Sequence, residues 1–167
     1  MREIINVFRE FAGLEGMFRF LGHTLQQPIR FFADDKAGTV LARVTPNQLH
    51  SGFPGVVHGG LQATLLDEVA FWAVWDKTAK LGFTADIYVR YRRAVAVDQE
   101  LTIRGVVTRQ DGPLVTVAAD LFDLAENNCT HATIRYYLAP RSVWEQQYGP
   151  LPFADSCFEP PGFRVQR

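Results

Sequence analysis

The feature that most constrains the fold of this chain is one long apolar stretch with helical character. Residues 58–76 run HGGLQATLLDEVAFWAVWD, with few polar side chains after the opening glycines. At about 100° per residue, the apolar side chains of residues 61–75 point to every side of a helix. Water would leave too much apolar area exposed, so other structure must cover this helix all round. We therefore predict a buried helix over about residues 59–79.

Two groups on this predicted helix carry chemistry. The Gly59-Gly60 start leaves backbone N–H groups without side chains in the way, which suits a carbonyl oxygen that gains negative charge. Asp67 lies two turns further on, where an ionised carboxylate is costly unless it has partners or a function. Glu68 faces about 100° away from it, and we interpret it as an interface or rim group. The combination favours acyl-transfer chemistry.

Composition excludes several classes of protein. A chain of 167 residues with 47% hydrophobic residues is typical of one compact domain. A formal net charge of −1 offers no broad attraction for nucleic acid or anionic lipid. Cys129 and Cys157 form no CxxC pair, which fits a reducing compartment, and we expect a cytoplasmic protein. No apolar run reaches the roughly 20 residues of a membrane span.

We divide the chain into three parts. Residues 1–35 are predicted to be an N-terminal helical extension, because apolar residues recur at helical spacing between about residues 2 and 21. Residues 36–140 form the main domain. Residues 141–167 are a Pro-rich C-terminal tail that we expect to be irregular.

The main domain is predicted to be α+β. Alternating apolar and polar residues predict strands at about 38–44, 84–93, 101–109, 114–122 and 130–138. The strands that follow the helix have short connections, so we expect them to pair antiparallel as a meander. One sheet cannot cover a helix that is apolar on all sides, so a second subunit or the N-terminal helix must cover the rest.

The motif residues resemble a known family. The run PGVVHGG at residues 54–60, with Asp67 nine positions after His58, resembles the hotdog-fold acyl-CoA thioesterases. Within them it resembles the 4-hydroxybenzoyl-CoA and phenylacetate-pathway group. The segment TADIYVRYRR at residues 84–93 is similar to the strand that follows the helix in that family, and the likeness covers about residues 38–138.

This resemblance implies a hotdog fold, a long central helix wrapped by a curved antiparallel sheet. It also implies hydrolysis of an acyl-CoA thioester to the free acid and CoA, without a metal or a cofactor other than the CoA of the substrate. The protein is expected to be a homodimer, with a homotetramer as the alternative.

The resemblance also assigns roles to residues. Asp67 matches the catalytic carboxylate, as a nucleophile or as a general base on water. The Gly59 N–H matches the group that polarises the thioester carbonyl, with His58 beside it, and Thr84 lies near the hydroxyl that holds the water or the carboxylate. The residues assigned to substrate and CoA binding are Gly60, Glu68, Arg92 and Arg93. The two arginines would meet the CoA phosphates, or they are simply the solvated end of a strand.

The chain departs from the family pattern at two places. Many members carry an Asn six residues before the His, where this chain has Gly52, and an Arg-Pro pair where it has Arg93-Ala94. Two other functions stay open: an acyl-CoA-binding hotdog protein without turnover, and a hotdog hydratase or dehydratase.

Overall fold

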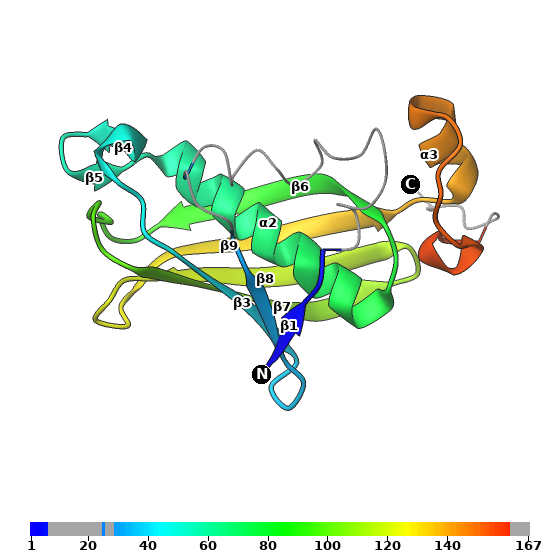
Figure 1. Ribbon diagram of the computed structural model, residues 1–167, viewed down its shortest axis with the longest axis horizontal. Coiled ribbons are helices and arrows are strands. Elements are labelled where there is room, and N and C mark those ends of the chain that lie inside the picture. The colour runs from blue at the N-terminus through cyan, green and yellow to red at the C-terminus, as the bar shows by residue number, and fades with distance from the viewer. Residues whose placement is uncertain (7–24, 26–28, 161–167) are drawn as a thin grey trace.

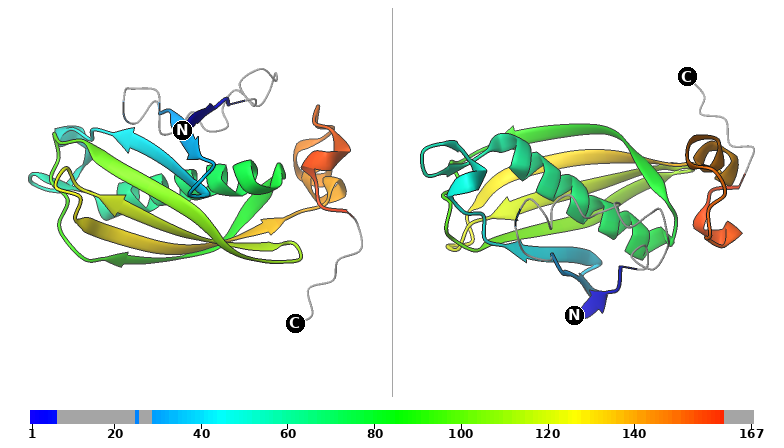
Figure 2. Two further views of the ribbon diagram at one scale, coloured as in Figure 1. Left: turned by 90° about the horizontal axis from the view of Figure 1, so that it is seen from below. Right: turned by 45° about the horizontal axis from the view of Figure 1, so that its top comes forward.

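A single long helix lies across a curved antiparallel sheet. The computed structural model describes residues 1–6, 25 and 29–160. In this part of the chain α2 (Gly59–Thr78) packs on one face of a seven-stranded sheet (Figures 1 and 2). The sheet strands are β1 (Arg2–Ile4), β2 (Phe31–Asp34), β3 (Thr39–Val44), β6 (Gly82–Tyr91), β7 (Leu101–Asp111), β8 (Leu114–Phe122) and β9 (Asn128–Leu138). The predicted α+β arrangement of a helix wrapped by an antiparallel sheet is confirmed.

The smaller elements lie at the two ends of this layer. A hairpin of β4 (Ser51–Phe53) and β5 (Val56–Val57) precedes α2, after the short 3-10 helix η2 (Gln48–His50). At the opposite end, α3 (Arg141–Tyr148) and the 3-10 helix η3 (Asp155–Cys157) follow β9 (Figure 1).

Helix α2 agrees with the predicted range to within a residue. His58 caps its start, and Ala79 ends it in the left-handed conformation. Most of its middle is enclosed, with Leu66 and Trp72 both 0% exposed, while Asp67 and Glu68 between them are partly exposed. The helix lies close to β7, because a Cβ on Gly105 would be only 3.0 Å from Val69 Cγ1. A larger residue at position 105 would push helix and sheet apart.

The strand order is β1-β2-β3-β7-β8-β9-β6, with every neighbouring pair antiparallel. The meander prediction is correct for β7, β8 and β9 but wrong for β6, which pairs with β9 at the edge instead of with β7. Residues 92–100 connect β6 to β7 past the N-terminal end of α2. Buried Val95 and Val97 hold this connection, as backbone hydrogen bonds join it to Val57 and Gly55.

The predicted N-terminal helix is wrong at its start. Arg2–Ile4 form β1, which pairs with β2 and extends the sheet. The rest of the predicted helix, from residue 7 to about residue 21, lies outside the described residues. The neighbouring β2 packs on α2, with Phe31 and Trp72 at 5.3 Å between ring centroids.

The C-terminal segment is more regular than predicted. Pro140 precedes α3 and Pro150 follows it, so these prolines bound the helix instead of interrupting it. Trp144 stacks on Phe83 of β6 with ring centroids 3.8 Å apart. This contact attaches the helix to the sheet, which explains why the segment is not irregular.

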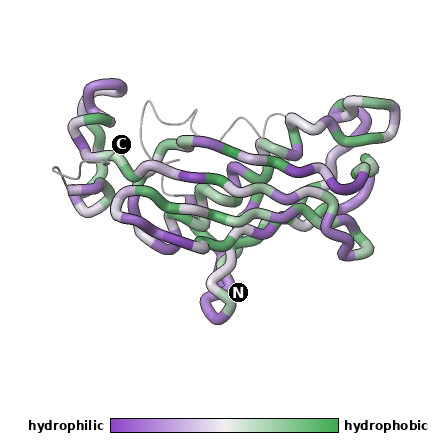
Figure 3. Tube along the Cα trace, turned by 180° about the vertical axis from the view of Figure 1, so that it is seen from behind, coloured by the Kyte–Doolittle hydropathy of each residue, from purple (hydrophilic) through white to green (hydrophobic). Residues whose placement is uncertain are grey.

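Residues alternate in polarity along the strands of the sheet. Seen from behind, the strands alternate between hydrophilic and hydrophobic residues (Figure 3). On β8, the buried Val115, Val117, Ala119 and Leu121 point toward α2, and the residues between them are partly exposed. The sheet therefore has one face on the core and one face turned away from it. None of the helices described here is long and apolar enough to cross a membrane.

Candidate active site

Two side chains from two strands meet the Asp67 carboxylate of α2. The Thr84 hydroxyl of β6 donates to Asp67 Oδ1 at 3.0 Å. The Tyr136 hydroxyl of β9 lies 2.6 Å from the same oxygen and 2.7 Å from the Asp67 backbone oxygen. The carboxylate is thus held from the sheet side by two hydroxyl groups. This arrangement is what a positioned acid–base or nucleophilic carboxylate requires.

A β-bulge turns Thr84 toward the helix. Thr84 pairs with Tyr136 and Asp86 pairs with Arg135, so the register shifts by one residue at Ala85. Simple alternation predicts Ala85 on the inner face and Thr84 on the outer one. The extra residue places Thr84 on the inner face, beside Tyr136. Ile87 and Val89 lie on the same face, opposite the buried Ile134 and Ala132. Bulges often reorient a side chain in this way next to a functional site.

Tyr136 was missed in the sequence analysis. It sits within a strand of apolar and polar alternation and is 1% exposed, so the pattern assigned it only to the core. Burial is the main cause that raises the pKa of its hydroxyl well above the usual value, and the neighbouring Asp67 charge adds to the effect. The available signal was a tyrosine at an inward position of a central strand, since a buried hydroxyl needs a partner.

The N-terminus of α2 is built from two glycines covered by two rings. The His58 side chain accepts a hydrogen bond from the Gly60 N–H through Nδ1 at 2.9 Å. The Tyr91 hydroxyl donates to the Gly59 carbonyl oxygen at 2.8 Å. A Cβ on Gly60 would be 2.9 Å from the His58 ring, and one on Gly59 would be 3.3 Å from the Tyr91 ring. A side chain at either position would therefore force one of these rings to shift.

The Gly59 N–H remains available at this end of the helix. Among the described residues it has no acceptor, whereas the Gly60 and Gln62 N–H groups are bonded to His58. A free N–H at a helix start is a donor for an oxygen that develops negative charge. This is the position that the sequence analysis assigned to carbonyl polarisation.

The structure gives a reason for the glycine at position 52. A Cβ there would lie 3.0 Å from His58 Cδ2 and 3.2 Å from His58 Cα. A side chain at this position would press on both the ring and the backbone of His58, which caps the helix. The Asn that many members of the resembled family carry would therefore require His58 to shift in this chain.

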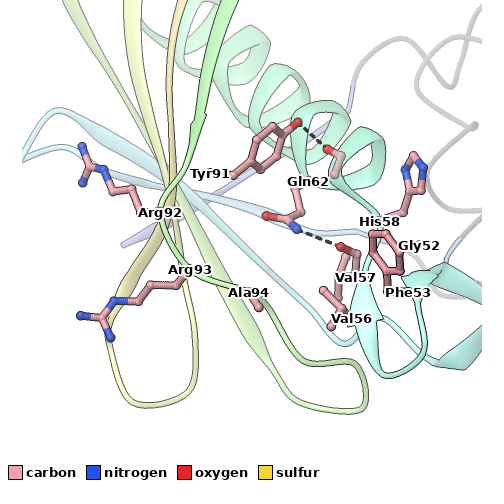
Figure 4. A pocket seen from close by; sticks show the side chains of 11 residues that line it. Gly52, Phe53, Val56, Val57, His58, Gln62, Tyr91, Arg92, Arg93 and Ala94 are labelled. Atoms are coloured by element: carbon pink, nitrogen blue, oxygen red, sulfur yellow. Dashed lines mark hydrogen bonds between the residues drawn. The ribbon is translucent and has the colours of Figure 1, made fainter.

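A cleft of about 610 Å³ opens beside this helix end. The β4–β5 hairpin forms one wall and residues 91–94 form the other (Figure 4). Arg92 and Arg93 line it, but both side chains point away from His58 and Phe53 (Figure 4). In the described part of the chain, neither guanidinium forms an ion pair, so both remain available for an anion at the rim.

Glu68, the residue after Asp67 on α2, forms a hydrogen bond within the helix. Its Oε1 accepts from the Trp72 Nε1–H at 3.2 Å. Burial raises the pKa of Glu68 to about 7, and the charge of Asp67 contributes in the same direction. Glu68 is thus a second carboxyl next to Asp67 that carries a proton for much of the time at neutral pH.

The structure does not bring all predicted residues to one point. Asp67 lies eight positions after Gly59 along α2, which corresponds to about 12 Å at the rise of an α-helix. Within one chain there are therefore two groups: Asp67 with Thr84, and His58 with Gly59 and Gly60. Across the described residues, no three His, Cys, Asp or Glu side chains gather in a way that could hold a metal ion.

Comparison with known proteins finds a family that is similar to part of this chain. Residues 54–130 match the model of the Thioesterase superfamily. This range contains the helix start, Asp67, Thr84 and both arginines, but ends before Tyr136. No curated protein matches the chain.

Solved structures share the fold. A crystal structure of a thioesterase superfamily protein is 32% identical, with a TM-score of 0.61 over 66% of this chain and 53% of that chain. The chain thus spans about half the length of that protein. A hypothetical thioesterase from Streptococcus pneumoniae TIGR4, solved with coenzyme A, is 24% identical, with a TM-score of 0.57 over 60% of this chain and 80% of that chain. Zebra fish thioesterase superfamily member 2 is 21% identical, with a TM-score of 0.64 over 78% and 92% of the two chains.

Residues 54–130 of this chain are therefore similar to the Thioesterase superfamily, and the helix-on-sheet architecture is consistent with the hotdog fold expected from the motif.

Proposed function

We propose that this protein hydrolyses an acyl-CoA thioester to a free acid and CoA. The observation that carries the proposal is the pairing, on one helix, of a free Gly59 N–H at a cleft with an Asp67 carboxylate held by two hydroxyl groups. The first group can polarise a thioester carbonyl, and the second can attack it or activate water.

The site is completed by a second copy of the chain. Reacting atoms must come within about 3.5 Å of each other, and one chain holds the two groups about 12 Å apart along α2. A homodimer in which two helices lie antiparallel brings Gly59 of one subunit to Asp67 of the partner subunit. Strand β6 supports this assembly, because it is a ten-residue edge strand with Tyr88 and Tyr91 more than half exposed.

The chemistry then follows one of two routes. As a nucleophile, the Asp67 carboxylate attacks the thioester carbon and the C–S bond breaks, which gives a mixed anhydride and CoA thiolate; water then hydrolyses the anhydride. As a general base, Asp67 takes a proton from water while the water oxygen attacks the carbon, and that proton passes to the departing sulfur. In both routes the Gly59 N–H stabilises the oxyanion.

Coenzyme A is proposed to occupy the cleft beside Gly59. Arg92 and Arg93 stand at its rim, where guanidinium groups can bind phosphates. The Streptococcus pneumoniae neighbour was solved with coenzyme A, and also as mutants in which one aspartate or one threonine is replaced by alanine. These residue types match the Asp67–Thr84 pair. The motif resemblance makes aromatic acyl-CoAs the first substrates to test.

The test is thiol release from a panel of acyl-CoAs that varies in chain length and aromaticity, followed with a thiol-reactive dye. Release of CoA that depends on the enzyme supports the proposal. Loss of the double bond of an enoyl-CoA without thiol release would instead indicate a hydratase. Saturable binding of acyl-CoA without any turnover would indicate a binding protein.

A further inference from the structure

The Tyr136 hydroxyl is a single donor with two acceptors on one residue. It lies 2.6 Å from Asp67 Oδ1 and 2.7 Å from the Asp67 backbone oxygen. A tyrosine hydroxyl has only one proton, so it can point to one of these oxygens or share the proton between them. Both acceptors belong to the proposed catalytic residue.

Both hydroxyl groups of the site approach the same carboxylate oxygen. Thr84 Oγ1 donates to Oδ1 at 3.0 Å, and Tyr136 also reaches Oδ1. Within the described residues no hydrogen bond reaches Oδ2. The two oxygens of Asp67 are therefore different: Oδ1 is held by the sheet, and Oδ2 is left to face a reactant.

The sheet itself sets this arrangement. Thr84 and Tyr136 are directly paired neighbours on β6 and β9, brought to the same face by the bulge at Ala85. Tyr136 is 1% exposed and packs near Phe71 at 6.4 Å between ring centroids. Its ring therefore has little freedom to move, and a rigid donor fixes its acceptor more precisely than a mobile one.

We propose that Tyr136 is a positioning residue which, together with Thr84, holds Asp67 by Oδ1 and so makes Oδ2 the oxygen that attacks or takes the proton. This inference rests on the proposed thioesterase function and specifies which atom of Asp67 reacts. Tyr136 itself neither gains nor loses a proton in the reaction.

The Asp67 backbone oxygen, as the second acceptor, gives the buried Tyr136 hydroxyl a partner at every stage of the reaction. When Oδ2 gains a proton or an acyl group, Asp67 loses its negative charge and Oδ1 becomes a weaker acceptor. The Tyr136 proton can then move its hydrogen bond to the Asp67 backbone oxygen, so a buried polar group is not left without a partner. Because burial raises the pKa of Tyr136 well above its usual value, the hydroxyl stays a donor throughout the working pH range.

The test compares Tyr136→Phe with Tyr137→Phe in the full-length protein. Tyr137 is the next residue on β9, partly buried on the opposite face of the sheet. We expect Tyr136→Phe to lower kcat by about 10- to 100-fold, the scale of a misplaced reacting group, with KM for acyl-CoA almost unchanged. Tyr137→Phe should keep both constants. A loss of structure alone would lower the fraction of protein that is active, which active-site titration and thermal melting detect. It would leave kcat per active site unchanged.

A second pair of variants keeps the proposal testable if Tyr136→Phe does not fold. Thr84→Val removes the other donor to Oδ1 and should lower kcat at constant KM, whereas Thr84→Ser retains the hydroxyl and should restore most of it. An unchanged kcat in folded Tyr136→Phe or in Thr84→Val, with an active wild type, would overturn this inference and leave the proposed function standing. A wild type that releases no thiol from any acyl-CoA would overturn both.

Discussion

The Tyr91 hydroxyl donates to the Gly59 carbonyl oxygen at 2.8 Å, and the same ring covers Gly59 so closely that a Cβ there would lie 3.3 Å from it. The end of β6 therefore holds the first turn of α2. Because the Gly59 N–H and C=O belong to successive peptide groups of that turn, Tyr91 fixes the direction in which the proposed oxyanion donor points. The edge strand thus contributes to the site at both ends, through Thr84 at Asp67 and through Tyr91 at Gly59.

Tyr91→Phe keeps the ring and removes this hydrogen bond. We expect kcat/KM to fall about fivefold, which corresponds to one hydrogen bond of about 1 kcal/mol, since the donor would be less well oriented. Steady-state kinetics of thiol release measure the effect. Tyr148→Phe is the matched control, because Tyr148 is an equally exposed tyrosine on α3, at the opposite end of the sheet from Gly59. Equal losses in both variants would show that Tyr91 has no special role.

Asp67→Asn should keep the fold and lower turnover by at least about 100-fold, the scale of losing one acid–base group. The amide preserves the size of the side chain and an acceptor for Thr84 and Tyr136, so thermal melting should change little. Asp111→Asn, at the exposed β7–β8 turn, is the control for a lost surface carboxylate. Near-normal turnover in folded Asp67→Asn would contradict the assignment.

The sequence predicted the parts of the site that lie on the helix and missed those that depend on the sheet. His58, Gly59 and Asp67 lie on one helix, so their spacing already determines their relative positions. Tyr136 reaches Asp67 only through the pairing of β9 with β6, and 69 residues separate the two in the chain. Local periodicity carries no information about such a contact, nor about the bulge at Ala85.

The same reasoning applies to the fold. Periodicity predicted α2 and the five long strands, because each buries one regular set of side chains. It failed for β1, since three residues of strand cannot be distinguished from the start of a helix without knowledge of their partner β2. The edge position of β6 depends on how residues 92–100 pass the helix end, which is a tertiary property.

Replacing Arg92 or Arg93 with Ala should raise KM for acyl-CoA and leave kcat nearly unchanged, because binding common to ground and transition states is lost. The guanidinium groups stand at the cleft rim without ion-pair partners in the described residues, so their removal leaves no buried group unsatisfied. A short thioester without the nucleotide serves as the control substrate and should be hydrolysed normally. If both substrates are affected equally, the arginines are structural and CoA binds elsewhere.

The free energy of unfolding should fall as the pH rises toward neutrality, because of Glu68. Its pKa is raised from 4.5 to about 7 in the folded protein. Folding therefore favours the protonated form: the stabilisation is complete below about pH 4.5 and is lost as the pH rises through 7. The shift corresponds to about 3 kcal/mol. Glu68→Gln keeps an acceptor for Trp72 and removes the titration, so it should be more stable than the wild type at pH 8 and similar at pH 4.5.

Urea unfolding at several pH values and one protein concentration measures this difference. Other titrating groups affect both proteins equally and cancel in the comparison. Parallel curves of unfolding free energy against pH for wild type and Glu68→Gln would show that Glu68 titrates normally in the folded state.

Activity should depend on protein concentration in the range where the dimer dissociates. One chain holds the Gly59 N–H and the Asp67 carboxylate about 12 Å apart along α2, so a monomer cannot apply both to one carbonyl carbon. Light scattering with a parallel assay of thiol release checks this expectation. The sharper test mixes inactive Asp67→Asn with a second inactive variant, Gly59→Pro, which lacks the N–H. A mixed dimer then contains one site with both defects and one intact site, so activity should reappear on mixing. A dilute monomer with full activity, or a mixture that stays inactive although mixed dimers form, would show that each site lies within one chain.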